Sequence, residues 1–227
     1  MPVTIHAIAA DELMPGEIER WRRVPVAVAV DVSRPHGQID PAIRPLKSAG
    51  KQPHLFGRAI TAACMPPDFG AVLWAIEQVN AGDLLVIAAD GHSETAMIGE
   101  ILGGHVRRRG GVGLICDGAI RDVGTLAAWT DFSVFTRHIT PRGPSSAEYG
   151  GVNVPVEVGG CLVYPGDLII GDDDGLVALR PDAVRDRIAD AEAKLGLEER
   201  WEADLAAGQS IARTFNLGGA IDASAVP

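Results

Sequence analysis

GEILGGHVRRRGGVGLICDGAIRDVG, residues 99–124, is the stretch that decides the fold. Its first half has helical spacing, and we expect a helix over residues 98–109 that ends in arginines, where cations suit the helix dipole. Gly110-Gly111 then breaks the chain, and VGLIC, residues 112–116, predicts a buried strand. The acid–base pair Arg121-Asp122 follows where this strand ends. Helix, tight turn and apolar strand in this order are typical of an α/β layer.

The same alternation extends outward in both directions. We expect strands at residues 24–32, 56–64, 83–89 and 132–136, because these runs are β-branched or wholly apolar. A helix capped by Asp68 and running to about Asn80 precedes the third strand, a turn at Asp90-Gly91 follows it, and a short helix follows Arg121. The sequence therefore predicts an α/β fold, a compact layered domain with a mixed or parallel sheet and helices.

The second half of the chain changes character. Short strands predicted at residues 152–158, 161–164, 167–171 and 175–180 form a β-meander or a small barrel-like sheet. GDDDG, residues 171–175, lacks the spacing of a calcium loop and predicts a hairpin turn. Pro181 begins a long helix whose charged face and Trp201 suit a neighbouring subunit as well as its own core. We expect one domain over residues 1–227, with an N-terminal helix at 11–21 and the C-terminal helix and tail (208–227) as subunit contacts.

Composition excludes several classes of protein. The net charge of −10 argues against binding nucleic acid through its phosphates. Three cysteines without CxxC spacing predict reduced thiols in a cytoplasmic protein. The N-terminus does not resemble a signal peptide, and no apolar stretch is long enough to span a membrane.

The candidate site consists of Glu100, Arg121 and Asp122. Carboxylates are the ligands that Mg²⁺ or Mn²⁺ prefers, and an adjacent arginine can hold a substrate carboxylate with its planar fork. The backbone N–H groups of Gly99, Glu100, Ile101 and Leu102 would also bind an anion if they begin a helix. A surface salt bridge at a strand end is the alternative interpretation of the same residues.

Other chemistry has weaker support in the sequence. The histidines show no metal-ligand spacing, and His92 is expected in a solvated loop at a strand end. No nucleophilic serine elbow, Walker loop or dinucleotide fingerprint occurs, and the lysines lie in loops or on exposed helix faces. Metal-assisted chemistry is therefore the enzymatic reaction that the residues favour.

GEIL (99–102) and, fourteen residues further on, DGAIRD (117–122) resemble the RraA-like family, which includes 4-hydroxy-4-methyl-2-oxoglutarate aldolases. Supporting segments in the expected order are FGRAIT (56–61), AGDLLVI (81–87), PRGP (141–144), GVNVPVEVGG (151–160) and PGDLIIGDDDGLVAL (165–179). The resemblance implies an RraA-like fold that assembles as a homotrimer or homohexamer, with sites between subunits. It also implies a magnesium or manganese ion on Asp122, a pyruvyl carboxylate on Arg121 and the amides of residues 99–102, and a metal-bound water organised by Glu100.

One site residue of this chain departs from the family pattern, and the first 55 residues match it less clearly. Aldolases of the family commonly have aspartate where this chain has Glu100, so the position of that water and the substrate preference can differ. A second carboxylate could come from a neighbour's C-terminal helix, with Glu198, Glu199 and Glu202 as candidates. Residues 33–36, Ser-Arg-Pro-His, fall where distal substrate groups could be recognised.

The resemblance implies a retro-aldol reaction. A divalent metal would polarise the carbonyl of a 4-hydroxy-2-oxo acid, and cleavage between C3 and C4 would release pyruvate; the same chemistry decarboxylates oxaloacetate. The alternative is a non-catalytic protein that binds and regulates a ribonuclease, as some relatives do. A methyltransferase is the least supported function, because the chain lacks a glycine-rich loop after its first strand.

Overall fold

The computed structural model describes residues 2–8 and 13–219 and is built around a mixed sheet. Its central strands run parallel in the order β3 (Leu55–Ala63), β4 (Asp83–Ile98), β5 (Gly113–Ile120) and β6 (Ser133–Ile139). The hairpin of β10 (Leu168–Asp172) and β11 (Gly175–Leu179) extends the sheet, because β10 pairs antiparallel with β3. Short strands complete it: β7 (Gly151–Val152) pairs with β3 and with β1 (Thr4–Ile5), and β2 (Arg44–Pro45) pairs with β6. The predicted α/β fold with a mixed sheet is confirmed.

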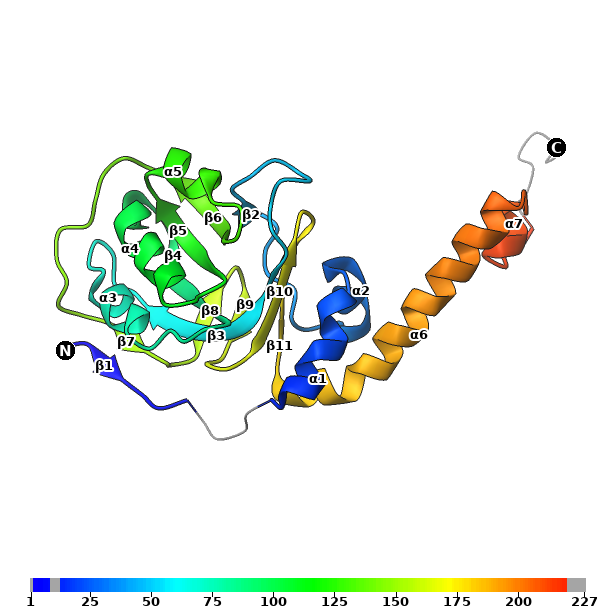
Figure 1. Cartoon of the computed structure of the whole chain (residues 1–227), viewed down its shortest axis with the longest axis horizontal. Coiled ribbons are helices and arrows are strands. Elements are labelled where there is room, and N and C mark those ends of the chain that lie inside the picture. Colours follow the sequence, from blue (N-terminus) through cyan, green and yellow to red (C-terminus); the bar gives the residue numbers. More distant parts are fainter. Residues whose placement is uncertain (1, 9–12, 220–227) are drawn as a thin grey trace, which may run out of the picture.

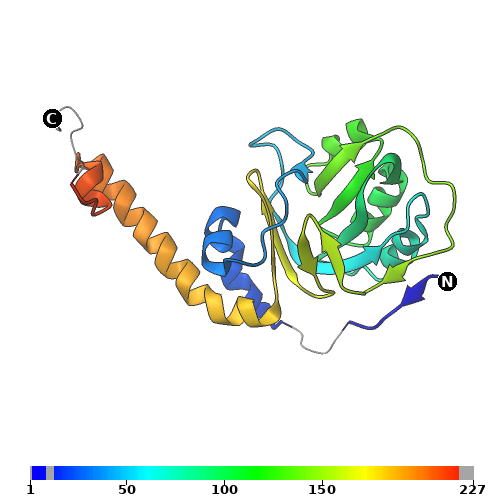
Figure 2. The ribbon, with the colours of Figure 1, turned by 180° about the vertical axis from the view of Figure 1, so that it is seen from behind.

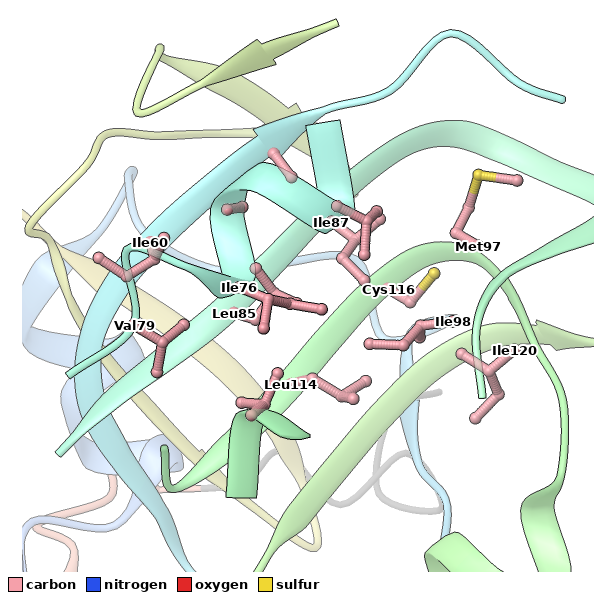
Figure 3. Packing of buried hydrophobic residues seen from close by; sticks show 14 of the residues in the cluster. Ile60, Ile76, Val79, Leu85, Ile87, Met97, Ile98, Leu114, Cys116 and Ile120 are labelled. Carbon is pink, nitrogen blue, oxygen red and sulfur yellow. The ribbon is translucent and has the colours of Figure 1, made fainter. Parts of the chain in front are cut away.

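Both faces of the central strands are covered. Helices α3 (Gly70–Ile76), α4 (Glu100–Arg108) and α5 (Val123–Ala128) pack on one face. Figure 3 shows the apolar side chains between these layers, among them Ile60, Leu85, Ile87 and Leu114. A two-stranded sheet of β8 (Val156–Val158) and β9 (Cys161–Val163) covers the other face. Strands buried on both sides need no polar alternation, which is why residues 83–89 are wholly apolar.

A separate apolar cluster joins the N-terminal helices to the β10–β11 hairpin. It includes α1 (Pro15–Glu19), the 3₁₀ helix Arg20–Arg23, α2 (Val26–Ser33) and the first half of α6 (Pro181–Ala206). The indole of Trp21 is fully buried and donates to the carbonyl of Val184 at 2.9 Å. Beyond this cluster α6 extends away from the body, with α7 (Ile211–Thr214) folded against its far end (Figures 1 and 2).

The strand predicted at residues 24–32 is wrong, because these residues form helix α2. Pro25 stands at the N-cap, and Val26, Val28 and Ala29 are buried against the β10–β11 hairpin and α6. The alternation of valine with alanine has no polar face, so it does not distinguish a strand from a buried helix. The packing of this segment favours a helix, and alanine has the highest helix propensity of all residues.

The prediction that a turn at Asp90-Gly91 ends the strand is wrong. Both residues have positive φ, 49° and 66°, but strand β4 continues through them as far as Ile98. The register of β4 against β5 shifts three times between Ala88 and Ile98, so the positive φ values mark bulges in a long strand. His92 consequently lies within a strand and not in a solvated loop, and α4 begins at Glu100 and not at residue 98.

Other predicted elements are confirmed with adjusted bounds. The 171–175 segment is the β10–β11 hairpin turn, and a long helix begins at Pro181. The predicted meander is divided, since β8 and β9 pair only with each other while β10 joins the main sheet. Of the helix predicted at 11–21, residues 11 and 12 lie outside the described residues, and α1 covers Pro15–Glu19. All three cysteines are free thiols.

Candidate functional site

The pairing of β4 with β5 brings the two predicted motifs together. Ile98 and Ile120 are opposite each other in the register, and the amide of Arg121 donates to the carbonyl of Ile98 at 3.1 Å. Gly99 and Arg121 therefore follow neighbouring parallel strands at their carboxyl ends. Ligands of open α/β sheets bind at this edge, where loops and helix N-termini converge.

Helix α4 begins at this edge with a glycine that supplies no capping side chain. The carboxylate of Asp122 takes that place, because its Oδ2 accepts the amide of Glu100 at 3.1 Å. A Cβ at Gly99 would collide with the same Oδ2 atom. Within residues 2–8 and 13–219 the next two amides, those of Ile101 and Leu102, have no acceptor. They lie at the positive end of the helix dipole and are available to an anion.

Asp122 adopts a left-handed backbone conformation, with φ 57° and ψ 35°, at the N-cap of α5. Aspartate and asparagine are the non-glycine residues that tolerate this region best. Its carbonyl accepts the amides of Thr125 and Leu126, and its Oδ2 lies 3.6 Å from Nε of Arg121. The other carboxylate oxygen, Oδ1, has no partner in the described part of the chain. One oxygen of Asp122 is thus used in the fold, and one is left for a ligand.

Arg121 is positioned by a glycine for which the sequence alone indicates no role. A Cβ at Gly143 would lie 2.6 Å from Nη1 of Arg121, so the guanidinium crosses a stretch of backbone that only glycine leaves clear. The amide of Ala96 donates to the carbonyl of Arg142 at 2.8 Å and fixes this loop to β4. The signal in the sequence is weak, since PRGP (141–144) supports the family resemblance without indicating what its glycine contacts.

A buried carboxylate holds the other end of the same loop. Asp68 is 3% exposed and accepts the hydroxyl of Ser146 at 2.5 Å and the amides of Gly70, Glu148 and Tyr149 at 2.8 to 3.0 Å. Burial alone would raise the pKa of Asp68, but these donors together lower it to about 2. The N-cap residue of α3 is Phe69 and not the predicted Asp68, which accepts the amide of Gly70 from one residue further back and anchors the loop that carries Gly143.

The site is a shallow hollow of about 40 Å³. Its walls include Phe69, Met97, Leu102, Arg121, Asp122 and Pro144. Pockets that enclose small ligands have volumes of several hundred Å³, so this hollow does not surround a 2-oxo acid by itself. Ile101 at its rim is 73% exposed, and the side chain of Glu100 is exposed and has no partner among the residues that the structure describes.

The donor set suits a hard cation that keeps most of its waters. No group of three metal-ligating side chains occurs among the described residues, so a cage made only of protein is not present there. Magnesium often binds through one or two carboxylates and completes its shell with water and substrate oxygens. The free Oδ1 of Asp122 fits that mode, and Glu100 begins the helix beside it.

Several other sequence candidates do not line this hollow. The ring of His92 contacts Thr95, with Nε2 2.8 Å from its Oγ1. Residues 33–36 line a separate hollow beside the start of α6. Glu198, Glu199 and Glu202 lie on the part of α6 that extends away from the body, and a role for them in a neighbouring subunit stays a prediction.

Residues 26–178 match the sequence profile of the RraA-like family, described as Aldolase/RraA. The chain belongs to the RraA-like family. An RraA-like relative in Halalkalibacterium halodurans, named as a candidate 4-hydroxy-4-methyl-2-oxoglutarate aldolase, is 32% identical over 162 residues. That match covers 71% of this chain and 75% of the relative.

Solved structures agree with this membership. Streptomyces coelicolor RraAS2, described as an unusual member of the RNase ES inhibitor RraA family, is 27% identical with a TM-score of 0.73. The alignment covers 84% of this chain and 98% of RraAS2. An uncharacterised Pseudomonas syringae protein has the same fold, with a TM-score of 0.78 at 20% identity over 89% of this chain and 98% of its own. RraA-like proteins thus include both named aldolases and ribonuclease inhibitors. None of the helices in the described part of the chain has the length and apolar character needed to cross a membrane.

Proposed function

We propose that this chain is a divalent-metal-dependent lyase that cleaves 4-hydroxy-2-oxo acids to pyruvate and a second carbonyl product, and decarboxylates oxaloacetate. The observation that carries the proposal is the convergence of three groups at one sheet edge. These are Oδ1 of Asp122, the guanidinium of Arg121, and the two amides at the start of α4; Oδ1 and both amides have no partner among the described residues.

Arg121 and the amides of Ile101 and Leu102 bind the carboxylate of the 2-oxo acid in this proposal. The guanidinium offers a planar pair of donors, and the helix dipole favours the negative charge. Gly143 keeps the guanidinium over the hollow, which orients the carboxylate and hence the adjacent carbonyl group. Orientation of this kind lowers the barrier because the reacting groups need not search for each other.

Asp122 would hold the cation through Oδ1. When bound, magnesium or manganese supplies Lewis-acid stabilisation of the negative charge that develops on the 2-oxo oxygen, an effect worth several kcal/mol. Glu100, exposed and without a partner in the described chain, accepts through a water the proton that leaves the C4 hydroxyl. The C3–C4 bond then breaks, its electrons remain with the three-carbon fragment, and a proton added at C3 gives pyruvate.

An open hollow of about 40 Å³ supports a site completed by a second subunit. We propose a homotrimer or homohexamer in which a neighbour covers the exposed rim near Ile101. Glu198, Glu199 or Glu202 of that neighbour would supply a second carboxylate. Light scattering of the purified protein tests the assembly independently of activity.

The decisive experiment measures pyruvate release from 4-hydroxy-4-methyl-2-oxoglutarate and from oxaloacetate, with Mg²⁺, with Mn²⁺ and with EDTA. We expect metal-stimulated turnover by the native protein and none by Asp122→Ala. Asp190→Ala, which removes an exposed carboxylate paired with Arg187 on the same helix, is the matched control and should retain activity. Equal cleavage of oxaloacetate by Asp122→Ala and the native protein would show that Asp122 does not hold the metal.

The similarity to RraAS2 favours a second candidate function, regulation of a ribonuclease by direct binding. That function requires a protein surface and no metal. It would replace the first proposal if the purified chain inhibits a ribonuclease in an RNA-cleavage assay and releases no pyruvate from either acid. Inhibition that is unchanged in Asp122→Ala would separate the two functions.

A further inference from the structure

Two turns far apart in the sequence share one unusual geometry. They are Asn80–Asp83 and Tyr164–Asp167, and each immediately precedes or begins a strand. In each turn the fourth residue donates its amide to the carbonyl of the first at 3.1 Å. The first residue returns its amide to Oδ2 of the aspartate, at 2.9 Å for Asp83 and 2.8 Å for Asp167. The third residue is a glycine in both, with φ of 86° and 87°.

The sheet places these two aspartates in one row with two arginines. Asp83 on β4 is opposite Arg58 on β3, and Arg58 is opposite Leu168, the residue after Asp167. Leu168 is in turn opposite Leu179, the residue before Arg180. Acidic and basic side chains therefore alternate across four neighbouring strands. This row lies at the end of β4 opposite to Gly99.

Each aspartate uses its second oxygen to face an arginine. Oδ1 of Asp83 lies 3.7 Å from Nε of Arg58, and Oδ1 of Asp167 lies 3.3 Å from Nε of Arg180. Arg180 also stacks on the ring of Tyr164, with Cζ 3.7 Å from the ring centroid. The Nε edge of each guanidinium is thus turned towards a carboxylate. Its Nη atoms have no acceptor within residues 2–8 and 13–219.

Burial distinguishes the acidic groups from the basic ones. Asp83 and Asp167 are 3% and 1% exposed, whereas the side chains of Arg58 and Arg180 are 39% and 49% exposed. The carboxylates are buried under their own turns, and the guanidiniums lie nearer to the surface. Oδ1 of Asp167 is buried without a hydrogen bond in the described structure, and its contact with Nε of Arg180 is an ion pair only.

All four charged residues line one hollow of about 160 Å³. The rest of the wall is mostly apolar and consists of Ile8, Leu13, Asn80, Pro165, Gly166 and Pro181. A concave site with a few oriented polar groups on an apolar wall is the usual form of a small-ligand pocket. It shares no lining residue with the hollow at Asp122.

We propose that this hollow is a second ligand site, which takes a small oxyanion on the Nη atoms of Arg58 and Arg180. A guanidinium whose Nε faces a carboxylate leaves its two Nη atoms to a ligand, in the planar geometry that matches a carboxylate or a phosphate. Two such groups on one wall suit a dianion, either a short dicarboxylate or inorganic phosphate. The site is independent of the lyase proposed above, because none of its residues belongs to that centre.

Calorimetric titration of the 227-residue chain with succinate and with phosphate, at constant ionic strength, tests the proposal. The titrations are carried out in the Arg121→Gln background, so that an acid bound at the other hollow does not contribute heat. We expect binding of at least one of the two anions, weakened at least tenfold by Arg58→Gln or Arg180→Gln. Arg23→Gln, which removes an exposed arginine outside the hollow, is the matched control and should bind as its parent does.

Lysine variants distinguish a specific loss of binding from a loss of folding. Arg58→Lys and Arg180→Lys keep the charge above the buried carboxylate but lack the planar fork, so we expect folded proteins with affinity between native and glutamine variants. Binding of only phosphate or only succinate identifies the ligand class and supports the site. Absence of binding by both anions, or binding that the glutamine and lysine variants leave unchanged, overturns the proposal.

Discussion

Arg121 crosses the backbone of Gly143 so closely that a Cβ at Gly143 would lie 2.6 Å from its Nη1. We expect Gly143→Ala to displace the guanidinium, which is the flexible end of a side chain, and to leave stability within about 1 kcal/mol of native. The KM for 2-oxo acids should rise about tenfold or more, because the carboxylate loses an oriented partner.

Steady-state kinetics with oxaloacetate would measure this change. Gly124→Ala is the matched control, since nothing lies within 4 Å of a Cβ there. Unchanged KM in Gly143→Ala would mean that the position of Arg121 does not limit substrate binding.

Asp122→Asn is expected to separate the structural use of this side chain from its charge. Asparagine tolerates the left-handed backbone, and its amide oxygen can still accept the Glu100 amide, so the free energy of unfolding should change by less than about 1 kcal/mol. Loss of the negative charge should weaken manganese binding about a hundredfold. Paramagnetic titration with Mn²⁺ would measure it, and native affinity in this variant would remove Asp122 from the metal site.

Asp68 predicts a pH dependence of stability with a defined sign. Its pKa is about 2 in the folded protein and about 4 in an unfolded chain. The folded state therefore gains about 2 kcal/mol from the ionised carboxylate above about pH 4, and loses it as the pH falls towards 2. Urea unfolding at several pH values should show Asp68→Asn less stable than native protein at pH 6, with the gap narrowing below pH 4. A gap that stays constant with pH would contradict this account.

Trp21 joins the N-terminal helices to α6. Trp21→Phe removes the indole donor to Val184 and leaves a space in a fully buried site, so we expect a loss of about 1–3 kcal/mol. Denaturant unfolding would measure it. Trp74→Phe, at a side chain that is 51% exposed, should cost less than about 1 kcal/mol.

The alternation of apolar strand segments with helical segments in the sequence predicted the layers of the fold. It failed at residues 24–32, where valine and alanine alternate without a polar face and the packing of α2 on the β10–β11 hairpin decides. It also failed at Asp90-Gly91, since a turn signal in the sequence does not distinguish a loop from a bulge in a paired strand.

The candidate site was predictable to the extent that it is local in the sequence. Glu100 and Asp122 belong to recognisable motifs at strand ends, and the pairing of β4 with β5 brings their segments together, so that the Glu100 amide donates to the Asp122 carboxylate. Gly143 and Asp68 were not predictable as partners of the site. Their contacts join segments 22 and 78 residues apart along the chain, which no periodicity reports.

The far half of α6 should behave differently from the near half. Val184, Ile188 and Ala191 are buried in the body, whereas Trp201 beyond them contacts Phe215 of the chain just after α7. A helix held mainly by its own hydrogen bonds opens easily at this length. Amide hydrogens beyond about residue 197 should therefore exchange with deuterium within seconds in a separated chain. Slower exchange in the purified protein would show that a neighbouring subunit covers this half of the helix, as the proposed homotrimer or homohexamer requires.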